Sequence, residues 1–270
     1  MEYCSIMQID YHGKKVVVTG ASSGIGEMLV RRIAAYGGTP IMLARSVEKL
    51  RQLQLQINEE YNIRAFYYKV DLTDEVEMDE VVASIIREHD VIHALINNAG
   101  TGVFQYVENT SVQDVELMFR LNVLAVIRMT KLFIPQFKAN KGGHIVNIAS
   151  QAGKISTPKS AVYASTKHAI LGFTNALRQE LADYQINVTA VNLGPVKTNF
   201  FSHADPEGNY QQNVEKYMLD PEKVALKICE NLFSKKREIN MPMWMDIGSR
   251  FYQLFPGMME KVLKKQFNKK

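Results

Sequence analysis

The sequence predicts an α/β fold, a single-domain doubly wound parallel β-sheet of about seven strands with helices on both faces. Short apolar runs alternate with segments of helical length from residue 15 to about residue 245, as in repeated strand–helix–strand units. The short runs are almost continuously apolar, which is typical of strands buried on both faces of a parallel sheet. The 270 residues contain no Pro/Gly/Ser-rich linker and no internal repeat, so one domain of this class accommodates them.

The expected elements follow one another without a long irregular segment. Helical segments such as 47–61 and 74–88 separate the strands, because their apolar residues recur at helical spacing. We expect an N-terminal extension at 1–12, the α/β domain at 13–245 and an amphipathic tail at 246–270. The seven expected strands are 14–20, 39–45, 65–71, 91–100, 143–150, 186–194 and 237–243.

Composition excludes several classes of protein. The net charge is only +4 and no basic stripe is interleaved with aromatic residues, so no nucleic-acid partner is expected. Two cysteines, Cys4 and Cys229, are too few for a disulfide framework or a metal site, so no metal is expected. The N-terminus lacks the apolar core of a signal peptide, and no run of about 18 apolar residues occurs. We therefore expect a cytoplasmic protein.

A glycine-rich turn, "TGASSGIG", follows the first strand directly and opens a helix. It places Gly20, Gly24 and Gly26 where backbone N–H groups and the positive end of the helix can approach a pyrophosphate. The spacing is G-x-x-x-G-x-G, which differs from the common dinucleotide pattern G-x-G-x-x-G. A tight turn without a ligand is the alternative, but its place on the first strand of a βαβ series favours dinucleotide binding.

The end of the second strand, "MLARS", indicates which dinucleotide binds. An NAD site usually has a carboxylate here for the ribose hydroxyls, whereas this chain has Ala44 and Arg45. An arginine can hold a 2′-phosphate in two hydrogen bonds. Arg45, helped by Ser46 and Ser22, therefore predicts NADP(H) as the preferred cofactor, with NAD(H) as the second choice. The alternative is that Arg45 is only a solvated residue after a strand.

Four motifs together resemble the short-chain dehydrogenase/reductase family. They are "TGASSGIG", "NNAG" at 97–100, Ser150 at the end of a strand, and "YASTK" with Tyr163 and Lys167. The resemblance covers roughly residues 13–200 and implies an NAD(P)-dependent oxidoreductase on a Rossmann fold. It implies that Tyr163 is the proton donor, Lys167 its activator and Ser150 the carbonyl anchor. Asn122 in "RLNVLAV" matches the fourth member, which holds a water next to the lysine.

The cofactor contacts are expected to come from several loops at one edge of the sheet. "NLGPVKT" resembles the family's cofactor loop, although Leu193 replaces the usual proline, and Asp71 is placed to accept from the adenine amino group. The complete expected set is Gly20, Ser22, Ser23, Gly24, Ile25, Gly26, Arg45, Ser46, Asp71, Leu72, Asn98, Ala99, Gly100, Tyr163, Lys167, Gly194, Pro195, Val196 and Thr198.

The spacing of Tyr163 and Lys167 has a physical reason. A free tyrosine has a pKa near 10, and bringing it to about 7 takes roughly 4 kcal/mol of preference for the phenolate. An ammonium about 6 Å away supplies somewhat under 3 kcal/mol at an effective dielectric constant near 20. We therefore expect the lysine to account for most of a lowered tyrosine pKa. In the reductive direction the tyrosine would protonate the oxygen as the carbonyl carbon accepts hydride.

The segment at about 196–219 is the expected substrate loop. Its sequence contains Phe200, Phe201, Tyr210 and Met218, which suit an apolar ketone or aldehyde, and its glycine and polar residues suit a mobile lid. The segment 151–160 is expected to line the opposite wall of the same pocket.

The tail is predicted to contain two amphipathic segments separated by Pro256 and Gly257. The second segment sets apolar residues against Lys261, Lys264 and Lys265. Two interpretations stay open: a helix packed on the domain or on a partner subunit of a homo-oligomer (dimer or tetramer), or a surface helix in weak peripheral contact with an anionic membrane.

Three functions remain open on the sequence. The first is an NADP(H)-dependent oxidoreductase that interconverts an apolar carbonyl compound and its alcohol. The second is a non-catalytic dinucleotide sensor, although the chain keeps Ser150, Tyr163, Lys167 and Asn122. The third is a membrane-associated scaffold acting through the tail.

Overall fold

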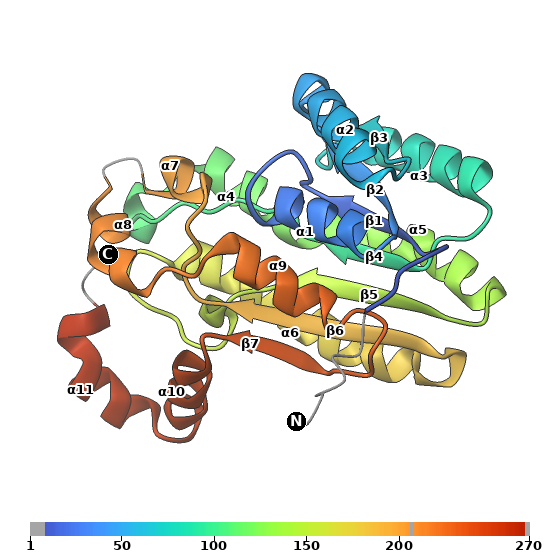
Figure 1. Ribbon diagram of the computed structural model, residues 1–270. Coiled ribbons are helices and arrows are strands. Elements are labelled where there is room, and N and C mark those ends of the chain that lie inside the picture. The colour runs from blue at the N-terminus through green and yellow to red at the C-terminus, as the bar shows by residue number, and fades with distance from the viewer. Residues whose placement is uncertain (1–8, 206–207, 268–270) are drawn as a thin grey trace, which may run out of the picture.

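A computed structural model of the protein describes residues 9–205 and 208–267. Its centre is one sheet of seven strands in the order β3-β2-β1-β4-β5-β6-β7, with every pair parallel (Figure 1). This confirms the predicted doubly wound α/β domain. The strands are β1 (Lys15–Thr19), β2 (Thr39–Ala44), β3 (Phe66–Lys69), β4 (Ala94–Asn97), β5 (Gly143–Ile148), β6 (Ile186–Leu193) and β7 (Glu238–Met241).

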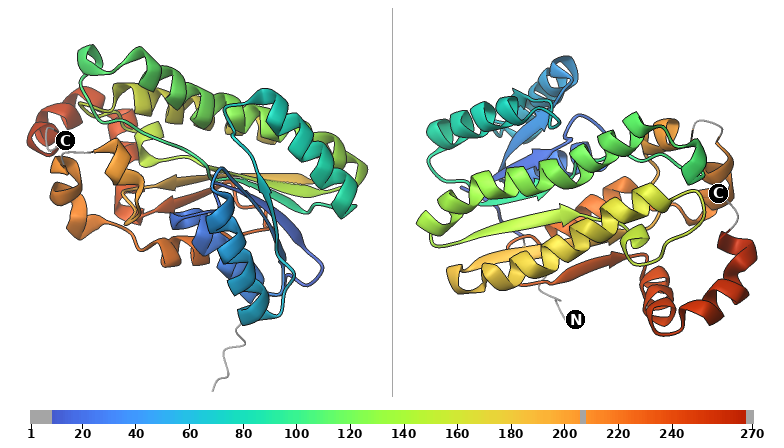
Figure 2. Two further views of the ribbon diagram at one scale, coloured as in Figure 1. Left: turned by 90° about the horizontal axis from the view of Figure 1, so that it is seen from above. Right: turned by 180° about the vertical axis from the view of Figure 1, so that it is seen from behind.

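Helices cover both faces of the sheet (Figure 2). On one face Ile33, Leu50 and Ile228 are fully buried in one apolar core, and on the other face Ile85 and Phe133 are buried in a second core. These residues come from α1 (Gly24–Ala35), α2 (Val47–Tyr61), α9 (Pro221–Cys229), α3 (Glu75–His89) and α5 (Ala125–Ala139); α6 (Ala161–Glu180) lies on the same face as α3 and α5.

The chain reverses its direction of strand addition at β1, which pairs with both β2 and β4. In such sheets ligands bind outside the carboxyl ends of the strands, at this switch point. Val18 is paired with Ile96, so the glycine turn after β1 and the Asn98 loop after β4 lie side by side. The predicted motifs therefore converge at one edge.

A buried polar network stabilises the sheet just below this edge. The Asn97 amide donates to the side-chain oxygens of Asn147 at 2.9 Å and Thr130 at 3.2 Å. The Asn147 amide in turn donates to Thr174 at 2.9 Å. Each buried amide thus has partners on neighbouring elements, so the network joins β4 and β5 to α5 and α6.

Element boundaries differ from the predictions at several places. The helix at 47–61 is α2 as predicted, and α3 begins one residue late because Asp74 caps it by accepting from the N–H groups of Val76 and Glu77. The final strand ends at Met241 instead of 243, because Pro242 follows it and precedes α10. The described part of the expected N-terminal extension includes Tyr11, which is buried; residues 1–8 lie outside the described part.

The expected substrate loop contains short helices, and the tail contains two longer ones. None of the helices in 9–205 and 208–267 is long and apolar enough to cross a membrane. The remaining elements are α4 (Val112–Phe119), a π-helical turn η2 (Arg120–Leu124), α7 (Phe200–Ala204), α8 (Asn209–Val214), α10 (Met243–Leu254) and α11 (Pro256–Phe267), with short 3₁₀ turns η1 (Val107–Asn109), η3 (Gln151–Gly153), η4 (Ala182–Tyr184) and η5 (Glu215–Tyr217).

Candidate active site

Ser150 and Tyr163 lie next to each other at the carboxyl end of β5. Ser150 precedes the turn η3, where its Oγ accepts from the N–H of Ala152 at 3.0 Å and donates to the carbonyl of Leu193 at 3.2 Å. Tyr163 lies on α6 and is buried, and a hydrogen bond with Ser150 favours its phenolate. The turn and the helix together therefore bring the predicted hydroxyl and phenol into contact.

Lys167 follows Tyr163 by one helical turn and is also buried. Its Nζ donates to the carbonyl of Ile148 at 3.1 Å and lies 5.7 Å from the centroid of the Tyr163 ring. The ammonium therefore lies close to the phenol ring.

The expected lowering of the tyrosine pKa is absent from this structure. Burial raises the pKa of Tyr163 to about 12, although the hydrogen bond with Ser150 acts in the opposite direction. Burial also lowers the pKa of Lys167 to about 8. The expectation was wrong because it counted the attraction between the two charges and left out the desolvation of each charge, which disfavours both.

Asn122 is held by the π-helical turn η2 between α4 and α5. Its Oδ1 accepts from the Thr101 N–H at 2.8 Å, and its Nδ2 donates to the Thr101 carbonyl at 2.8 Å and to Thr166 Oγ1 at 3.1 Å. A Cβ on Gly100 would lie 3.1 Å from Asn122 Oδ1 and 3.7 Å from Lys167 Nζ, so both side chains flank this glycine. Such π turns occur frequently at functional sites, and no pattern in the sequence predicts this one.

The glycine turn packs tightly against the loop after β4. Gly20 has φ +64°, and a Cβ on Gly26 would lie 2.2 Å from the carbonyl oxygen of Gly20. Asn98 Nδ2 donates to the carbonyls of Thr19 and Gly20, while Thr19 Oγ1 accepts from the N–H groups of Asn98 and Ala99 at 3.0 Å each. Thr19, which the sequence analysis did not single out, therefore joins the two predicted cofactor loops.

The start of α1 is open toward this edge. Ser23 is the N-cap residue, and its side chain does not cap the helix. A Cβ on Gly24 would lie 3.1 Å from the methyl group of Thr198, so the predicted loop 194–198 reaches the glycine turn. Ser22, Ile25, Pro195 and Val196 belong to the same two segments. Backbone donors at a helix N-terminus suit a phosphate group.

Arg45, Ser46 and Asp71 follow the neighbouring strands β2 and β3. Arg45 is exposed, and Ser46 begins α2 without a side-chain cap. Burial alone would raise the pKa of Asp71, but hydrogen bonds from Thr73 and the charge of Arg45 outweigh it and hold this pKa below its usual range. Leu72 is buried beside them. Arg45 is exposed and can therefore contact an anionic ligand.

An aromatic wall stands beside Tyr163. The Phe104 ring lies 5.6 Å from the ring of Tyr163 and 5.1 Å from that of Tyr210, and Phe200 lies 5.9 Å from Tyr163. The N–H of Phe104 donates to the carbonyl of Ala204 at 2.8 Å, which joins this loop to α7. The sequence predicted Phe200 and Tyr210 here but missed Phe104, because it comes from a distant loop.

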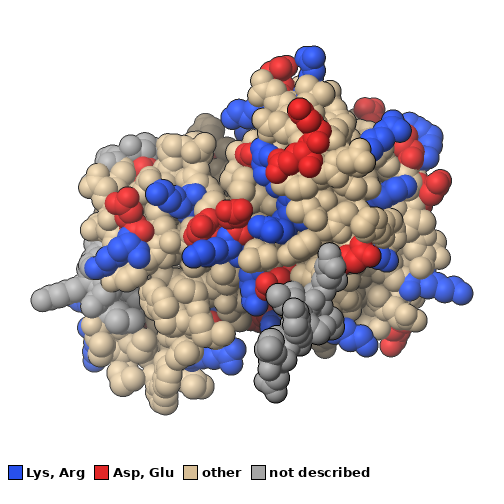
Figure 3. Space-filling view, in the orientation of Figure 1, with Lys and Arg blue, Asp and Glu red and all other residues tan. Residues whose placement is uncertain are grey.

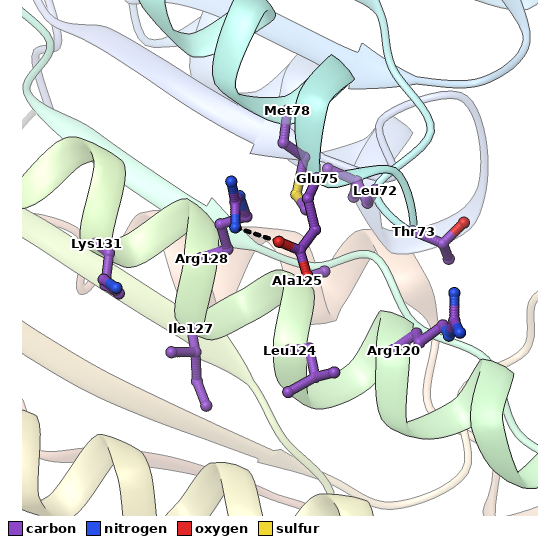
Figure 4. A pocket seen from close by; sticks show the side chains of 10 residues that line it. All are labelled: Leu72, Thr73, Glu75, Met78, Arg120, Leu124, Ala125, Ile127, Arg128 and Lys131. Atoms are coloured by element: carbon purple, nitrogen blue, oxygen red, sulfur yellow. Dashed lines mark hydrogen bonds and ion pairs between the residues drawn. The ribbon is translucent and has the colours of Figure 1, made fainter.

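A separate pocket of about 390 Å³ lies between α3 and α5 (Figure 4). Arg128 in this pocket is paired with Asp79 at 2.6 Å and also with Glu75, which gives its charge local partners. None of the four catalytic candidates lines the pocket, so we place the chemistry at the carboxyl ends of β4 and β5 instead. The pocket is lined by Leu72, Thr73, Glu75, Met78, Arg120, Leu124, Ala125, Ile127, Arg128 and Lys131.

Comparisons with known proteins identify the family of this chain. The NADP-dependent 3-hydroxy acid dehydrogenase of Schizosaccharomyces pombe is 34% identical over 236 residues, which is 85% of this chain and 89% of that protein. A short-chain dehydrogenase from Streptomyces avermitilis has 26% identity and a TM-score of 0.79 over 93% of this chain and 96% of its own. Serine dehydrogenase complexed with NADP⁺ has 28% identity and a TM-score of 0.75 over 84% and 94%. The family model described as short chain dehydrogenase matches residues 14–208, and the chain therefore belongs to the short-chain dehydrogenase family of oxidoreductases.

Proposed function

We propose that this protein is an NADP(H)-dependent oxidoreductase that interconverts an apolar ketone or aldehyde and its alcohol. The observation that carries the proposal is the group formed by the half-buried Ser150 and the buried Tyr163 and Lys167 beside an aromatic wall. A hydroxyl bonded to a phenol, with an ammonium 5.7 Å from the phenol ring, provides an oxygen-binding donor, a proton donor and a charge that favours the phenolate.

The residues at the edge of the sheet fit a phosphorylated dinucleotide. The pyrophosphate would meet the N-terminus of α1 at Gly24, where the Ser23 side chain does not cap the helix. The 2′-phosphate would meet Arg45 and Ser46, because β2 is followed by an arginine and not by a carboxylate. Two relatives support this choice, since one is named as NADP-dependent and one was solved with NADP⁺.

The chemistry then divides among the chain's own residues. The bound nicotinamide supplies or accepts the hydride. In reduction Ser150 Oγ donates a hydrogen bond to the substrate carbonyl oxygen, and Tyr163 transfers its phenolic proton to the same oxygen as negative charge develops there. Lys167 stabilises the phenolate that results, and Asn122 holds the loop at Thr101 and Gly100 next to the lysine.

Tyr163 can release its proton when the negative charge of the phenolate is compensated by the positive charge of Lys167. Without that compensation burial keeps Tyr163 neutral, and the neutral phenol is the form that acts as an acid in reduction. Lys167, with its pKa near 8, can give up a proton to reprotonate the phenolate near neutral pH. The pair can therefore pass one proton outward or inward in each turnover.

The substrate class follows from the wall. Phe104 and Phe200 are half-buried and offer apolar ring surface without a charge that would hold a carboxylate, and the buried Phe201 packs against both rings. The Schizosaccharomyces pombe relative is named for a 3-hydroxy acid, whereas we propose an apolar carbonyl compound here.

The test is the change in absorbance at 340 nm when purified protein meets NADPH and a panel of carbonyl compounds. The panel should contain aromatic and aliphatic ketones and aldehydes, together with 3-oxo acids. We expect turnover with the apolar compounds and little with the acids. Turnover confined to the acids would overturn the substrate class, and NADPH binding without any turnover would favour a sensor.

The expected homo-oligomer and the expected cytoplasmic location stay predictions. Static light scattering of the purified protein measures the first, since a dimer of a 30.7 kDa chain doubles the mass. Fractionation of cells into soluble and membrane fractions measures the second.

A further inference from the structure

Helix α10 has its polar and apolar faces reversed relative to an ordinary surface helix. Asp246 and Ser249 are 2% and 0% exposed and face the domain. Its large apolar side chains face outward, although an exposed apolar stripe of this kind is unusual on a protein surface. The exposed fractions are 68% for Met243, 56% for Trp244, 51% for Ile247, 52% for Phe251 and 70% for Leu254.

Specific contacts fix α10 in this orientation. Asp246 accepts from Lys154 at 2.9 Å and from Arg250 at 3.1 Å, and Ser249 Oγ donates to the Asp246 carbonyl at 2.8 Å. Met245 packs against Gly194, because a Cβ on that glycine would lie 2.7 Å from its sulfur. Rolling the helix to bury its apolar stripe would break the ion pair between Asp246 and Lys154 and leave Lys154 with Glu238 as its remaining carboxylate partner. The outward stripe is therefore a stable feature of the fold.

Helix α11 extends the same surface. Phe255, between the helices, is exposed, and so are Met258 and Val262 on α11. Tyr252 donates to Glu260 at 2.9 Å, which joins the two helices. Figures 1 and 2 show α10 and α11 as a V that projects from one end of the molecule, beside α8. In Figure 3 the surface in the same region is mostly tan, with Lys and Arg at its edges.

The charge of this segment indicates the chemistry of what covers it. Residues 256–270 contain five lysines and one glutamate, a net charge of +4 that equals the net charge of the whole chain. Lys261 and Lys264 lie on α11 within one turn of Val262 and are exposed. In a twofold contact with a second copy two such segments would face each other and repel. An anionic surface would instead attract every one of these lysines.

We propose that α10 and α11 form a peripheral docking surface for an anionic lipid bilayer. Exposed Trp, Phe and Leu side chains enter the boundary between headgroups and acyl chains, while the lysines contact anionic headgroups. Trp244 is also 5.8 Å from the ring of Tyr217, so the docked surface includes the end of the 196–219 segment. This inference does not depend on the proposed reaction.

Trp244 is the only tryptophan, so its emission reports directly on the surface. The full-length protein is mixed with vesicles of phosphatidylcholine and phosphatidylglycerol (3:1) or of phosphatidylcholine alone, at low salt. We expect a shift of the emission to shorter wavelength and co-sedimentation with the anionic vesicles. Both effects should weaken strongly at high salt, because screening removes the attraction of the lysines.

Variants distinguish binding through α10 and α11 from nonspecific adsorption to vesicles. Phe251→Glu combined with Val262→Glu should lower the partition coefficient at least tenfold. The matched control is Leu55→Glu combined with Val76→Glu, because these residues on α2 and α3 are 57% and 67% exposed. This control should bind like the unmodified protein.

A second pair isolates the contribution of charge. Lys261→Glu with Lys264→Glu should also lower the partition coefficient at least tenfold, because each lysine near an anionic surface contributes roughly fivefold. Lys49→Glu with Arg51→Glu on α2 makes the same change of charge elsewhere and should have little effect.

Full-length protein that shows neither the emission shift nor co-sedimentation at low salt overturns the proposal. Equal weakening by the control pair Leu55→Glu and Val76→Glu overturns it as well. A third outcome also overturns it: the protein does not bind vesicles, and Phe251→Glu halves the mass measured by light scattering. That result would assign the surface to a second copy of the chain. Circular dichroism of each variant checks that the changed side chains, all on the surface, leave the fold intact.

Discussion

Lys154 and Asp246 form an ion pair of 2.9 Å that joins the turn after Ser150 to helix α10, 92 positions later in the chain. Lys154 Nζ also donates to Glu238 at 2.7 Å and to Asn240 at 3.0 Å on β7. Both members of the pair are buried, with side chains 10% and 4% exposed. The turn after Ser150, the last strand and the tail therefore share one cation.

Removing that cation should destabilise the protein strongly. Lys154→Met leaves the carboxylates of Glu238 and Asp246 without their main partner, and breaking a buried ion pair costs about 3 kcal/mol or more. The control is Lys227→Met, because Lys227 forms an exposed pair with Glu230 and such pairs contribute about 1 kcal/mol at most. Urea unfolding measures both. Similar losses of unfolding free energy in the two variants would show that the buried pair contributes no more stability than the exposed pair.

The same pair should make stability depend on pH on the acid side. Burial alone would raise the pKa of Asp246, but Lys154 and Arg250 outweigh it and hold the pKa below 3.8. A lowered folded-state pKa stabilises the protein above pH 3.8, and this contribution is lost as the pH falls through the folded value. The difference in unfolding free energy between the unmodified protein and Lys154→Met should therefore shrink as the pH falls below about 4. A constant difference would contradict the assignment.

Lys167 should make stability depend on pH on the basic side. Burial lowers its pKa from 10.5 to about 8, so the folded protein loses this proton before the unfolded chain does. Between pH 8 and 10.5 the unfolded chain binds more protons, and stability therefore rises with pH over that window. Relative to Lys167→Met, the unmodified protein should gain about 3 kcal/mol there, at about 1.4 kcal/mol per pKa unit. Parallel curves for the two proteins in urea titrations would refute this.

The features that sequence predicted are those encoded within one element. Tyr163 and Lys167 share one helix, so their spacing alone places them on one face. The glycine turn can be recognised from its position between a strand and a helix. The βαβ rhythm predicted a parallel, doubly wound sheet, whereas the order of its strands comes from the structure. Such local patterns were enough to predict the fold and most of the candidate site.

The features that sequence missed depend on segments far apart in the chain. Phe104 reaches Tyr163 only because its loop is bonded to Ala204, 100 positions later. The sequence around Lys154 does not predict Asp246 as its partner, and this pair determines which face of α10 is exposed. The raised pKa of Tyr163 has the same origin, since it depends on how many elements close over the ring.

The cofactor preference can be tested at Arg45. NADPH should bind more tightly than NADH to the unmodified protein, because a guanidinium can hold the 2′-phosphate in two hydrogen bonds. Arg45→Asp should reverse the order, since a carboxylate repels the phosphate and accepts from the ribose hydroxyls. Arg51→Asp on α2 makes the same change of charge six positions later and should leave the order unchanged. Equal dissociation constants in the unmodified protein would sink the prediction.

Tyr163→Phe should reduce turnover by at least a hundredfold while the affinity for NADPH stays nearly constant. The variant removes only the hydroxyl, so the ring contacts with Phe104 and Phe200 remain and the proton donor is lost. Lys167→Ala should damage both turnover and NADPH binding, since its buried ammonium lies beside Gly100 in the expected cofactor loop.

Tyr184→Phe, at an exposed tyrosine in η4, is the control and should behave like the unmodified protein. Absorbance at 340 nm gives the rates and a fluorescence titration gives the affinities. A phenylalanine variant that keeps a substantial fraction of the rate would mean that another group protonates the substrate. Tyr210, whose ring lies 5.1 Å from that of Phe104, would then be the next residue to change.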